Sequence, residues 1–571
     1  MLRYILLWGL LLPLTAFAQQ FSKGTVVDEA NLPLMGAEVY WNGTQIGVST
    51  DDNGTFTLKR TESSNTLVIS YIGYKTKTVK VTNSEALHIQ LEPQSALEEV
   101  VVTQKRANTM KSQWQVANLH TMSSGELLKA ACCNLSESFS TNPSIDVNFS
   151  DAVTGNKQIK MLGLTSPYIL MAEENIPAMR GASQAYGLSF VPGTWIEITK
   201  GAGSVINGYE SISGQINYEI EKPINARPFF LNLYTSEDSR YELNAHTKVK
   251  LSDKWATSLL AHGNVRQRKS DHNHDGFIDN PIGNQINLLN RWQYSNAEKG
   301  WVSFVNLNYM KDERQAGQIN YNPLTDKGTT NAWGSEVNSE RFTLSNKTGY
   351  VFPDTPYKSI GLQNSFQSHR QDSYFGLNSY DIHQKSWYGN LIYNSIIGNT
   401  QHKFATGLSG TYDDYNEQLT TSALAGDFSR IDRSVGAFFE YTYDNSSNFS
   451  FVAGIRADSH NNLGNFITPR FHLRYNPWKQ ATFRLSAGRG KRAANVIAEN
   501  QQLLASSRQL HIIGGDGGKL YGLNPEIAWN YGASFLQAFK IWGKNAELSV
   551  DFYRTHFDNQ VVVDLDHSPQ Q

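Results

Sequence analysis

Strict alternation between apolar and polar residues dominates the second half of the chain. Between 241 and 251 the odd positions carry Tyr, Leu, Ala, Thr, Val and Leu, and the even positions carry Glu, Asn, His and two Lys. The same alternation recurs in 404–413, 435–444 and 449–458. A period of two predicts β-strands, because a helix through these segments would have no consistent face. Strands of about ten residues that are apolar outside and polar inside are typical of a membrane β-barrel, whereas a secreted β-sandwich has shorter strands and an apolar inner face.

The first part of the chain, 19–92, consists of short apolar runs separated by glycine turns. The runs 24–28, 37–41, 55–58 and 67–72 are rich in β-branched and aromatic residues. Asn53-Gly54 supplies the positive φ angles that a tight hairpin needs. These features predict a small antiparallel β-sandwich.

The middle part, 112–223, combines short strands with one helical stretch. We predict strands at 158–162, 168–171 and 195–200, and a helix around 124–138. Glycines at 201, 203, 208 and 214 suit tight turns and close backbone packing. The segment is not a phosphate-binding loop, because no Gly-Lys-Ser/Thr closes the motif.

Between these parts lies the β-branched run 97–103, Leu-Glu-Glu-Val-Val-Val-Thr, flanked by linker-like residues. It is typical of a strand and has no obvious partner in its own chain. Another protein can complete such a strand through backbone hydrogen bonds. The alternative is that it forms the last strand of the preceding sandwich.

The N-terminus predicts export. Arg3, an apolar run over 5–12 and the cleavage site Ala16-Phe17-Ala18 are typical of a signal peptide, so the mature chain would start at Gln19. No later apolar run is long enough for a transmembrane helix.

The two cysteines form no disulfide framework. Charged residues make up 18% and the formal net charge is −2, so we expect no nucleic-acid partner. Aromatic residues make up 12%, which suits the girdles of a barrel.

Four segments together carry a family resemblance. The run Glu98–Thr103 resembles the TonB box of TonB-dependent outer-membrane receptors, and 19–92 resembles the carboxypeptidase-regulatory-like domain of Bacteroidetes-type receptors. The stretch from Trp195 to Asn217 resembles the C-terminal half of the receptor plug. Leu523-Asn524-Pro525-Glu526 resembles a late-barrel pattern. One departure is Glu173-Glu174-Asn175-Ile176-Pro177, where many receptors carry Asp-Gly.

The resemblance implies five parts. They are a signal peptide (1–18), a carboxypeptidase-regulatory-like β-sandwich (19–92), a linker with the TonB box (93–111), a plug domain (112–223) and a partial transmembrane β-barrel (224–571). The fold class is then mainly β, with a small N-terminal β-sandwich, a mixed α/β plug domain and an antiparallel transmembrane β-barrel. Barrels of this family close with about 22 strands, whereas we count roughly sixteen here. We therefore expect the C-terminal strands to be missing from this sequence.

The resemblance also implies function. The protein would be an outer-membrane receptor in contact with outer-membrane lipid, with a periplasmic front domain, for energised uptake of a scarce nutrient. TonB would bind the following residues: Glu98, Glu99, Val100, Val101, Val102 and Thr103. The expected ligand is an iron–siderophore or other metal chelate; a SusC-like glycan importer and a cobalamin or haem receptor are the alternatives. We expect no enzyme, because neither an HExxH motif nor a nucleophile constellation is present. The front domain does not resemble a signalling domain.

Sulfur-containing side chains point to copper as a refinement of the ligand. Of two Cys and eight Met, seven lie between 110 and 179. The candidate soft-metal ligands are Cys132, Cys133, Met161, Met171 and Met179, because thiolates and thioethers favour copper(I). The alternative is that these residues pack the plug core.

The stretch 271–279, Asp-His-Asn-His-Asp-Gly-Phe-Ile-Asp, matches the start of a calcium loop. Asp271, Asn273, Asp275 and Asp279 would supply oxygen ligands, together with the carbonyl of Phe277. Ile282 stands where a bidentate Glu is usual, and no EF-hand helices flank the loop. We predict an extracellular barrel loop ordered by calcium, with a plain Asp-Gly turn as the alternative and transition-metal binding by His272 and His274 as another. No other cofactor is expected.

The basic stretch 488–492 could contact an anionic chelate, but we expect a solvated loop.

Overall fold

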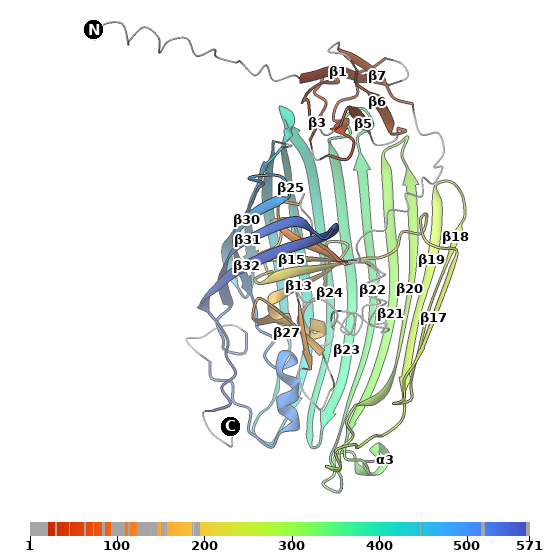
Figure 1. Cartoon of the computed structure of the whole chain (residues 1–571). Coiled ribbons are helices and arrows are strands. Elements are labelled where there is room, and N and C mark those ends of the chain that lie inside the picture. Colours follow the sequence, from red (N-terminus) through yellow and green to blue (C-terminus); the bar gives the residue numbers. More distant parts are fainter. Residues whose placement is uncertain are drawn as a thin grey trace, which may run out of the picture. The chain divides into compact units, whose positions relative to one another are not determined.

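The structure is a computed structural model, drawn in Figure 1. It describes residues 21–28, 31–44, 46–61, 64–71, 74–82, 86–92, 109–111, 115–122, 139, 145–149, 155, 157–184, 187, 195–445, 447–514 and 520–566. No helix among these residues is long and apolar enough to cross a membrane.

The N-terminal unit contains two small sheets around a common core. One sheet has the order β4 (Thr55–Lys59), β1 (Phe21–Val27), β7 (Leu87–Gln90), and the other has the order β3 (Gly47–Ser49), β2 (Glu38–Trp41), β5 (Thr66–Ser70), β6 (Lys77–Lys80). Alternating side chains such as Phe56 and Leu58 are buried between the sheets. The predicted β-sandwich is confirmed.

Two details of this unit differ from the prediction. The sandwich is not purely antiparallel, because β1 pairs with β7 in parallel. At the predicted hairpin turn only Gly54 has a positive φ, of 68°. The Asp51 carboxylate accepts hydrogen bonds from the amides of Asn53 and Thr55, so side-chain bonding shapes this turn in place of a second positive φ angle.

The plug is built on a six-stranded sheet that lies within the curve of the long sheet (Figure 1). Its order is β14 (Ile176–Met179), β13 (Ile169–Glu173), β16 (Gly214–Glu219), β15 (Trp195–Lys200), β9 (Asn118–Met122), β8 (Thr109–Lys111). A three-stranded sheet contains β10 (Asp146–Phe149), β11 (Lys157–Met161) and β12 (Leu164–Thr165). Short 3₁₀ turns are η3 (Ser166–Tyr168), η4 (Gly181–Gln184) and η6 (Val205–Asn207). The predicted strands 158–162 and 195–200 are confirmed within one residue, and the predicted strand 168–171 is confirmed as β13, which continues to Glu173. The predicted helix around 124–138 lies outside the described residues.

The remaining strands form one sixteen-stranded antiparallel sheet, which confirms the predicted strand number for the described part of the chain. Its members are β17 (Phe229–Thr235), β18 (Arg240–Lys250), β19 (Trp255–Arg266), β20 (Ile282–Asn296), β21 (Trp301–Gly317), β22 (Gly334–Val351), β23 (Ser359–Phe375), β24 (Asn378–Ile397), β25 (Asn399–Thr420), β26 (Ala425–Asp427), β27 (Arg430–Asp444), β28 (Phe449–His460), β29 (Gly464–Tyr475), β30 (Ala481–Arg492), β31 (Glu526–Ile541) and β32 (Lys544–Asn559). Consecutive strands are neighbours, except that short β26 pairs only with β25.

The predicted two-faced alternation is confirmed in these strands. In β18, Tyr241 and Leu243 are exposed while Glu242 between them is 3% exposed. In β27, Val435 is 62% exposed and Ser434 on the opposite face is 9% exposed. Apolar side chains therefore cover the outer face and polar side chains the inner face, as a membrane barrel requires.

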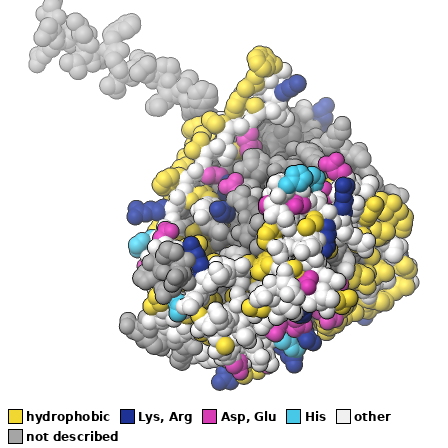
Figure 2. Space-filling view, turned by 90° about the horizontal axis from the view of Figure 1, so that it is seen from below, with side chains coloured by type: hydrophobic (Ala, Val, Ile, Leu, Met, Phe, Trp, Pro, Cys, Tyr) yellow, Lys and Arg dark blue, Asp and Glu magenta, His cyan; other side chains and the backbone are white. Residues whose placement is uncertain are grey.

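The two ends of this sheet differ in their connections. At one end the turns are short, as at 251–254, 297–300 and 542–543, and we call this the short-turn end. At the other, the long-loop end, strands are joined by 267–281, 318–333 and 493–525, with the small helix α3 (Pro323–Asp326). Figure 2 views the molecule from this end; hydrophobic side chains gather along its outer sides, and acidic and histidine side chains are scattered over the face. Outer-membrane barrels have short periplasmic turns and longer extracellular loops, so the long-loop end is extracellular.

Candidate functional site

One side of the plug lies directly on the backbone of the wall. A Cβ added to Gly488 of β30 would lie 2.3 Å from the Cβ of Ala202, and one added to Gly490 would lie 2.5 Å from Cγ1 of Ile212. Arg470 of β29 donates to the carbonyl of Ser204 at 2.6 Å. Glycine in the wall therefore allows the plug turn after β15 to pack without a gap.

The basic stretch 488–492 is the end of strand β30, so the predicted solvated loop is wrong. Lys491 is 8% exposed and donates to the carbonyl of Leu463 at 2.7 Å. Arg492 is 4% exposed and forms ion pairs with Glu499 and Glu526. The two side chains are consecutive in the strand, yet both are buried, and carbonyls and carboxylates satisfy them.

At the extracellular side of the plug lies a polar cavity, the apex pocket, between Arg180, Tyr209 and Glu210 of the plug and Asp413 and His460 of the wall. Arg180 joins the two sides: its Nε lies 3.0 Å from Oε2 of Glu210, and its NH1 lies 3.1 Å from Oδ2 of Asp413. The side chains of Arg180 and Asp413 are 13% and 2% exposed. A cation shared by two carboxylates therefore fastens the plug apex to β25.

The apex pocket also holds its histidine in one tautomer. Nδ1 of His460 accepts hydrogen bonds from the amides of Asn462 at 3.0 Å and Leu463 at 3.1 Å. Because both partners are donors, Nδ1 carries no proton, and the neutral ring is protonated at Nε2. The His460 ring packs edge-on to Tyr209.

The connection 493–525 folds inward over the plug, a feature that the sequence analysis did not predict. Its 3₁₀ segment η7 (Ala498–Ala505) places Ile497, Ala498 and Leu504 in the same buried cluster as plug residues. Asn378 of β24 donates to the carbonyl of Leu504 at 2.7 Å, and Gln371 of β23 donates to Gln501 at 2.7 Å. The apolar run 493–498 in an inter-strand connection was the signal that could have revealed it.

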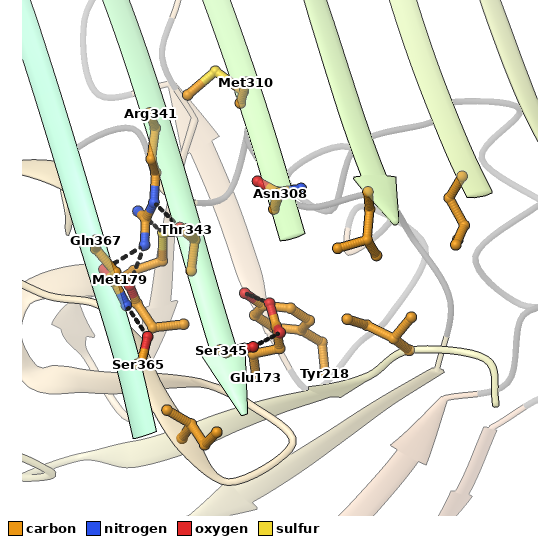
Figure 3. A pocket seen from close by; sticks show the side chains of 15 residues that line it. Glu173, Met179, Tyr218, Asn308, Met310, Arg341, Thr343, Ser345, Ser365 and Gln367 are labelled. Atoms are coloured by element: carbon orange, nitrogen blue, oxygen red, sulfur yellow. Dashed lines mark hydrogen bonds between the residues drawn. The ribbon is translucent and has the colours of Figure 1, made fainter. Parts of the chain in front are cut away.

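A second cavity, the wall pocket, lies between plug strands β13, β14 and β16 and wall strands β19–β23 (Figure 3). Glu173 projects from the plug side; its Oε1 accepts from Asn306 at 2.8 Å and its Oε2 from Tyr218 at 3.3 Å. Arg341 projects from the wall side and donates to the carbonyl of Ala178 and, at 2.7 Å, to Oε1 of Gln367. The pocket thus has one acidic and one basic group, on opposite walls.

The departure from the usual Asp-Gly is explained by the β13–β14 hairpin. Glu174 and Asn175 have φ angles of 49° and 67°, the left-handed pair that a tight hairpin requires. Asn tolerates this conformation well. Glu174 forms an ion pair with buried Arg291 of β20 at 2.6 Å, and Asn217 accepts from the Asn175 amide at 2.7 Å. Glycine adopts positive φ angles without strain, whereas here contacts with Arg291 and Asn217 stabilise the turn at Glu174 and Asn175.

The candidate soft-metal residues are only partly within the described structure. Met161, Met171 and Met179 are 1%, 2% and 5% exposed and belong to one buried cluster. Met171 and Met179 are register partners on adjacent strands. Cys132 and Cys133 lie outside the described residues. Within the described ranges, no group of three or more His, Cys, Asp or Glu side chains could hold a metal ion.

The candidate calcium loop lies at the long-loop end, between β19 and β20. The Asp271 carboxylate accepts from the amides of Asp275 at 3.1 Å and Gly276 at 3.0 Å. His272 lies 2.7 Å from Asp279, whose pKa is lowered by hydrogen bonds from the amide and ring of His272. The TonB-box residues Glu98–Thr103 lie outside the described residues.

Comparison with known proteins agrees with this arrangement of a plug inside a β-barrel wall. Residues 257–571 match the family described as TonB dependent receptor-like, beta-barrel, and residues 22–102 match the CarboxypepD_reg-like domain. The chain belongs to the TonB-dependent receptor family, whose barrels lie in the outer membrane and whose members are receptors, not enzymes.

Individual curated relatives match the chain only over short segments. The chain is 36% identical over 99 residues to TonB-dependent receptor SusC of Bacteroides thetaiotaomicron, which is 17% of this chain and 10% of SusC. It is 40% identical over 83 residues to TonB-dependent receptor P26 of Formosa agariphila, which is 14% of this chain and 8% of P26. The matches therefore span a tenth or less of these curated relatives.

Solved structures share the fold over most of the chain. The alcaligin outer-membrane receptor FauA of Bordetella pertussis has a TM-score of 0.59 at 14% identity, covering 81% of this chain and 75% of FauA. The siderophore receptor PirA of Acinetobacter baumannii has a TM-score of 0.62 at 13% identity, covering 80% and 73%. The copper transporter OprC has a TM-score of 0.56 at 12% identity, covering 78% and 72%.

Proposed function

We propose that this receptor imports a metal chelate of the ferric-siderophore class, with energy delivered by TonB. The apex pocket carries the proposal. It lies on the extracellular side of the plug and is lined by tyrosines, two arginines, a histidine and carboxylates, which suit an oxygen-rich chelate. FauA and PirA, which share the fold, are described as alcaligin and siderophore receptors.

Copper is the second candidate ligand. Met161, Met171 and Met179 share one buried cluster, and OprC is described as a copper transporter. A glycan importer is the remaining alternative, supported by the local similarity to SusC.

The test is a binding measurement on the full-length receptor in detergent, with copper, a ferric siderophore and cobalamin as separate probes. We expect saturable binding of the ferric siderophore, equal in the unaltered protein and in the Cys132→Ser/Cys133→Ser variant. Copper binding that disappears in the double variant would contradict the siderophore assignment and support the copper site.

We also propose that calcium orders the loop 271–279. Calcium would draw the oxygens of Asp271, Asn273 and Asp275 together, and the loop is already tied to its neighbour by Ile319, whose amide donates to the Gly276 carbonyl at 2.9 Å. At ten times its Kd, calcium should slow trypsin cleavage after Arg268 or Lys269 by about tenfold. Asp275→Asn should remove the effect, and magnesium is the control. Equal cleavage rates with calcium and with a chelator would contradict the proposal.

A further inference from the structure

Arg341 is a buried cation whose hydrogen-bond acceptors are all neutral. It lies midway along β22 and is 3% exposed. Its guanidinium donates to Sδ of Met179 at 2.7 Å, to the carbonyl of Ala178, to Oε1 of Gln367 at 2.7 Å and to Oγ1 of Thr343 at 3.3 Å. These acceptors are a thioether, a carbonyl, an amide and a hydroxyl.

Two other arginines of the wall are paired with carboxylates. Arg456 contacts the carboxylate of Asp458 at 2.6 Å, and Arg430 contacts that of Glu417 at 2.6 Å. Among the described residues, no carboxylate lies within ion-pair distance of Arg341. Glu173 lines the same pocket, but its oxygens accept from Asn306, Ser345 and Tyr218. Burying a charge without a counter-ion is costly, so this guanidinium is suited to receive an anion.

The wall pocket places further hydrogen-bonding side chains beside Arg341. Figure 3 shows Arg341 at one side of the pocket, with Thr343, Ser345 and Ser365 along the same wall. A two-oxygen acid group would engage the guanidinium fork with two charge-assisted hydrogen bonds, which are about twice as strong as neutral ones. We propose that the wall pocket binds a carboxylate-type group of the imported compound through Arg341. This inference rests on the proposed import function.

Anion binding at Arg341 would also loosen the plug. Ala178 and Met179 belong to β14, which is the edge strand of the plug sheet and pairs only with β13 among the described strands. On its other side β14 is held by Arg341. When an acid group takes the guanidinium, β14 loses these bonds, so ligand binding and displacement of this strand are thermodynamically linked.

The test uses hydrogen–deuterium exchange on the full-length receptor in detergent, with sodium succinate as probe and sodium chloride at equal ionic strength as control. Succinate should accelerate exchange in the peptide covering β14 saturably, by about threefold or more, while chloride should not. Arg341→Met should abolish the response and Arg341→Lys, which keeps the charge but loses the fork, should weaken it.

Arg456→Lys is the matched control. Arg456 is equally buried and donates to a plug carbonyl, that of Val205, but it is neutralised by Asp458. The Arg456→Lys variant should therefore show the same succinate response as the unaltered receptor. An unchanged β14 peptide in the unaltered receptor, or an equal response in Arg341→Met, would overturn the proposal. Because the assay contains neither TonB nor metal chelate, the succinate response is measured independently of the proposed import function, and failure of one does not imply failure of the other.

Discussion

Replacing Val100 or Val101 by proline should abolish energised uptake while leaving ligand binding at the cell surface unchanged. Proline removes a backbone donor and cannot continue a ladder, so a strand added by TonB would lose its pairing. A loss of about 1.4–2.8 kcal/mol in binding free energy would weaken the affinity for TonB by about tenfold to a hundredfold. Both positions are tested, because in a strand only alternate amides face the partner.

Uptake is measured in cells, and binding is measured on intact cells at a temperature where uptake is slow. Val101→Thr is the control, since threonine keeps both the β-branch and the amide. Unchanged uptake in both proline variants would show that Glu98–Thr103 is not the coupling strand.

Replacing Arg180 by methionine should detach the plug apex from the wall and weaken ligand binding. The substitution leaves the carboxylates of Glu210 and Asp413 facing each other without their cation. Removing one partner of a buried ion pair lowers stability by about 3–5 kcal/mol. We expect a loss near the lower end of this range, because the Glu210 side chain is 30% exposed. The measurement is protease protection of the plug, together with ferric-siderophore affinity.

The pH dependence of this variant should reverse. Burial by itself would raise the pKa of Glu210, but the neighbouring Arg180 outweighs burial and holds that pKa below its usual value. In the unaltered receptor the ion pair therefore stabilises the apex above the unfolded-state pKa, and this stabilisation is lost as pH falls through the depressed pKa. Without Arg180, burial raises the pKa of Glu210, so the variant should be better protected in acid than at neutral pH.

Arg370→Met is the control, because the Arg370–Asp372 pair is exposed and such pairs contribute little. A triple variant with Glu210→Gln and Asp413→Asn should recover protection. If Arg180→Met protects the plug as well as the unaltered protein does at every pH, Arg180 does not fasten the apex.

The local features of the fold follow from the residue pattern along the chain. Alternation in 241–251 and 435–444 predicted the strands and their two faces, since side-chain direction in a strand depends only on residue parity. The segments 19–92 and 195–217 identified the front domain and plug, and Gly54 was correctly placed in a turn.

Which side chains contact one another depends on how distant segments pack in three dimensions. Arg341 and Ala178 are 163 residues apart, and no periodicity encodes their contact. Lys491 and Arg492 look like a solvated basic loop in the sequence, yet the strand turns them toward carboxylates and carbonyls in the barrel interior. The inward fold of η7 likewise depends on its apolar residues reaching the plug core. The sequence shows which polar side chains need hydrogen-bond or ion-pair partners. The packing of the plug against the barrel wall determines which residues those partners are.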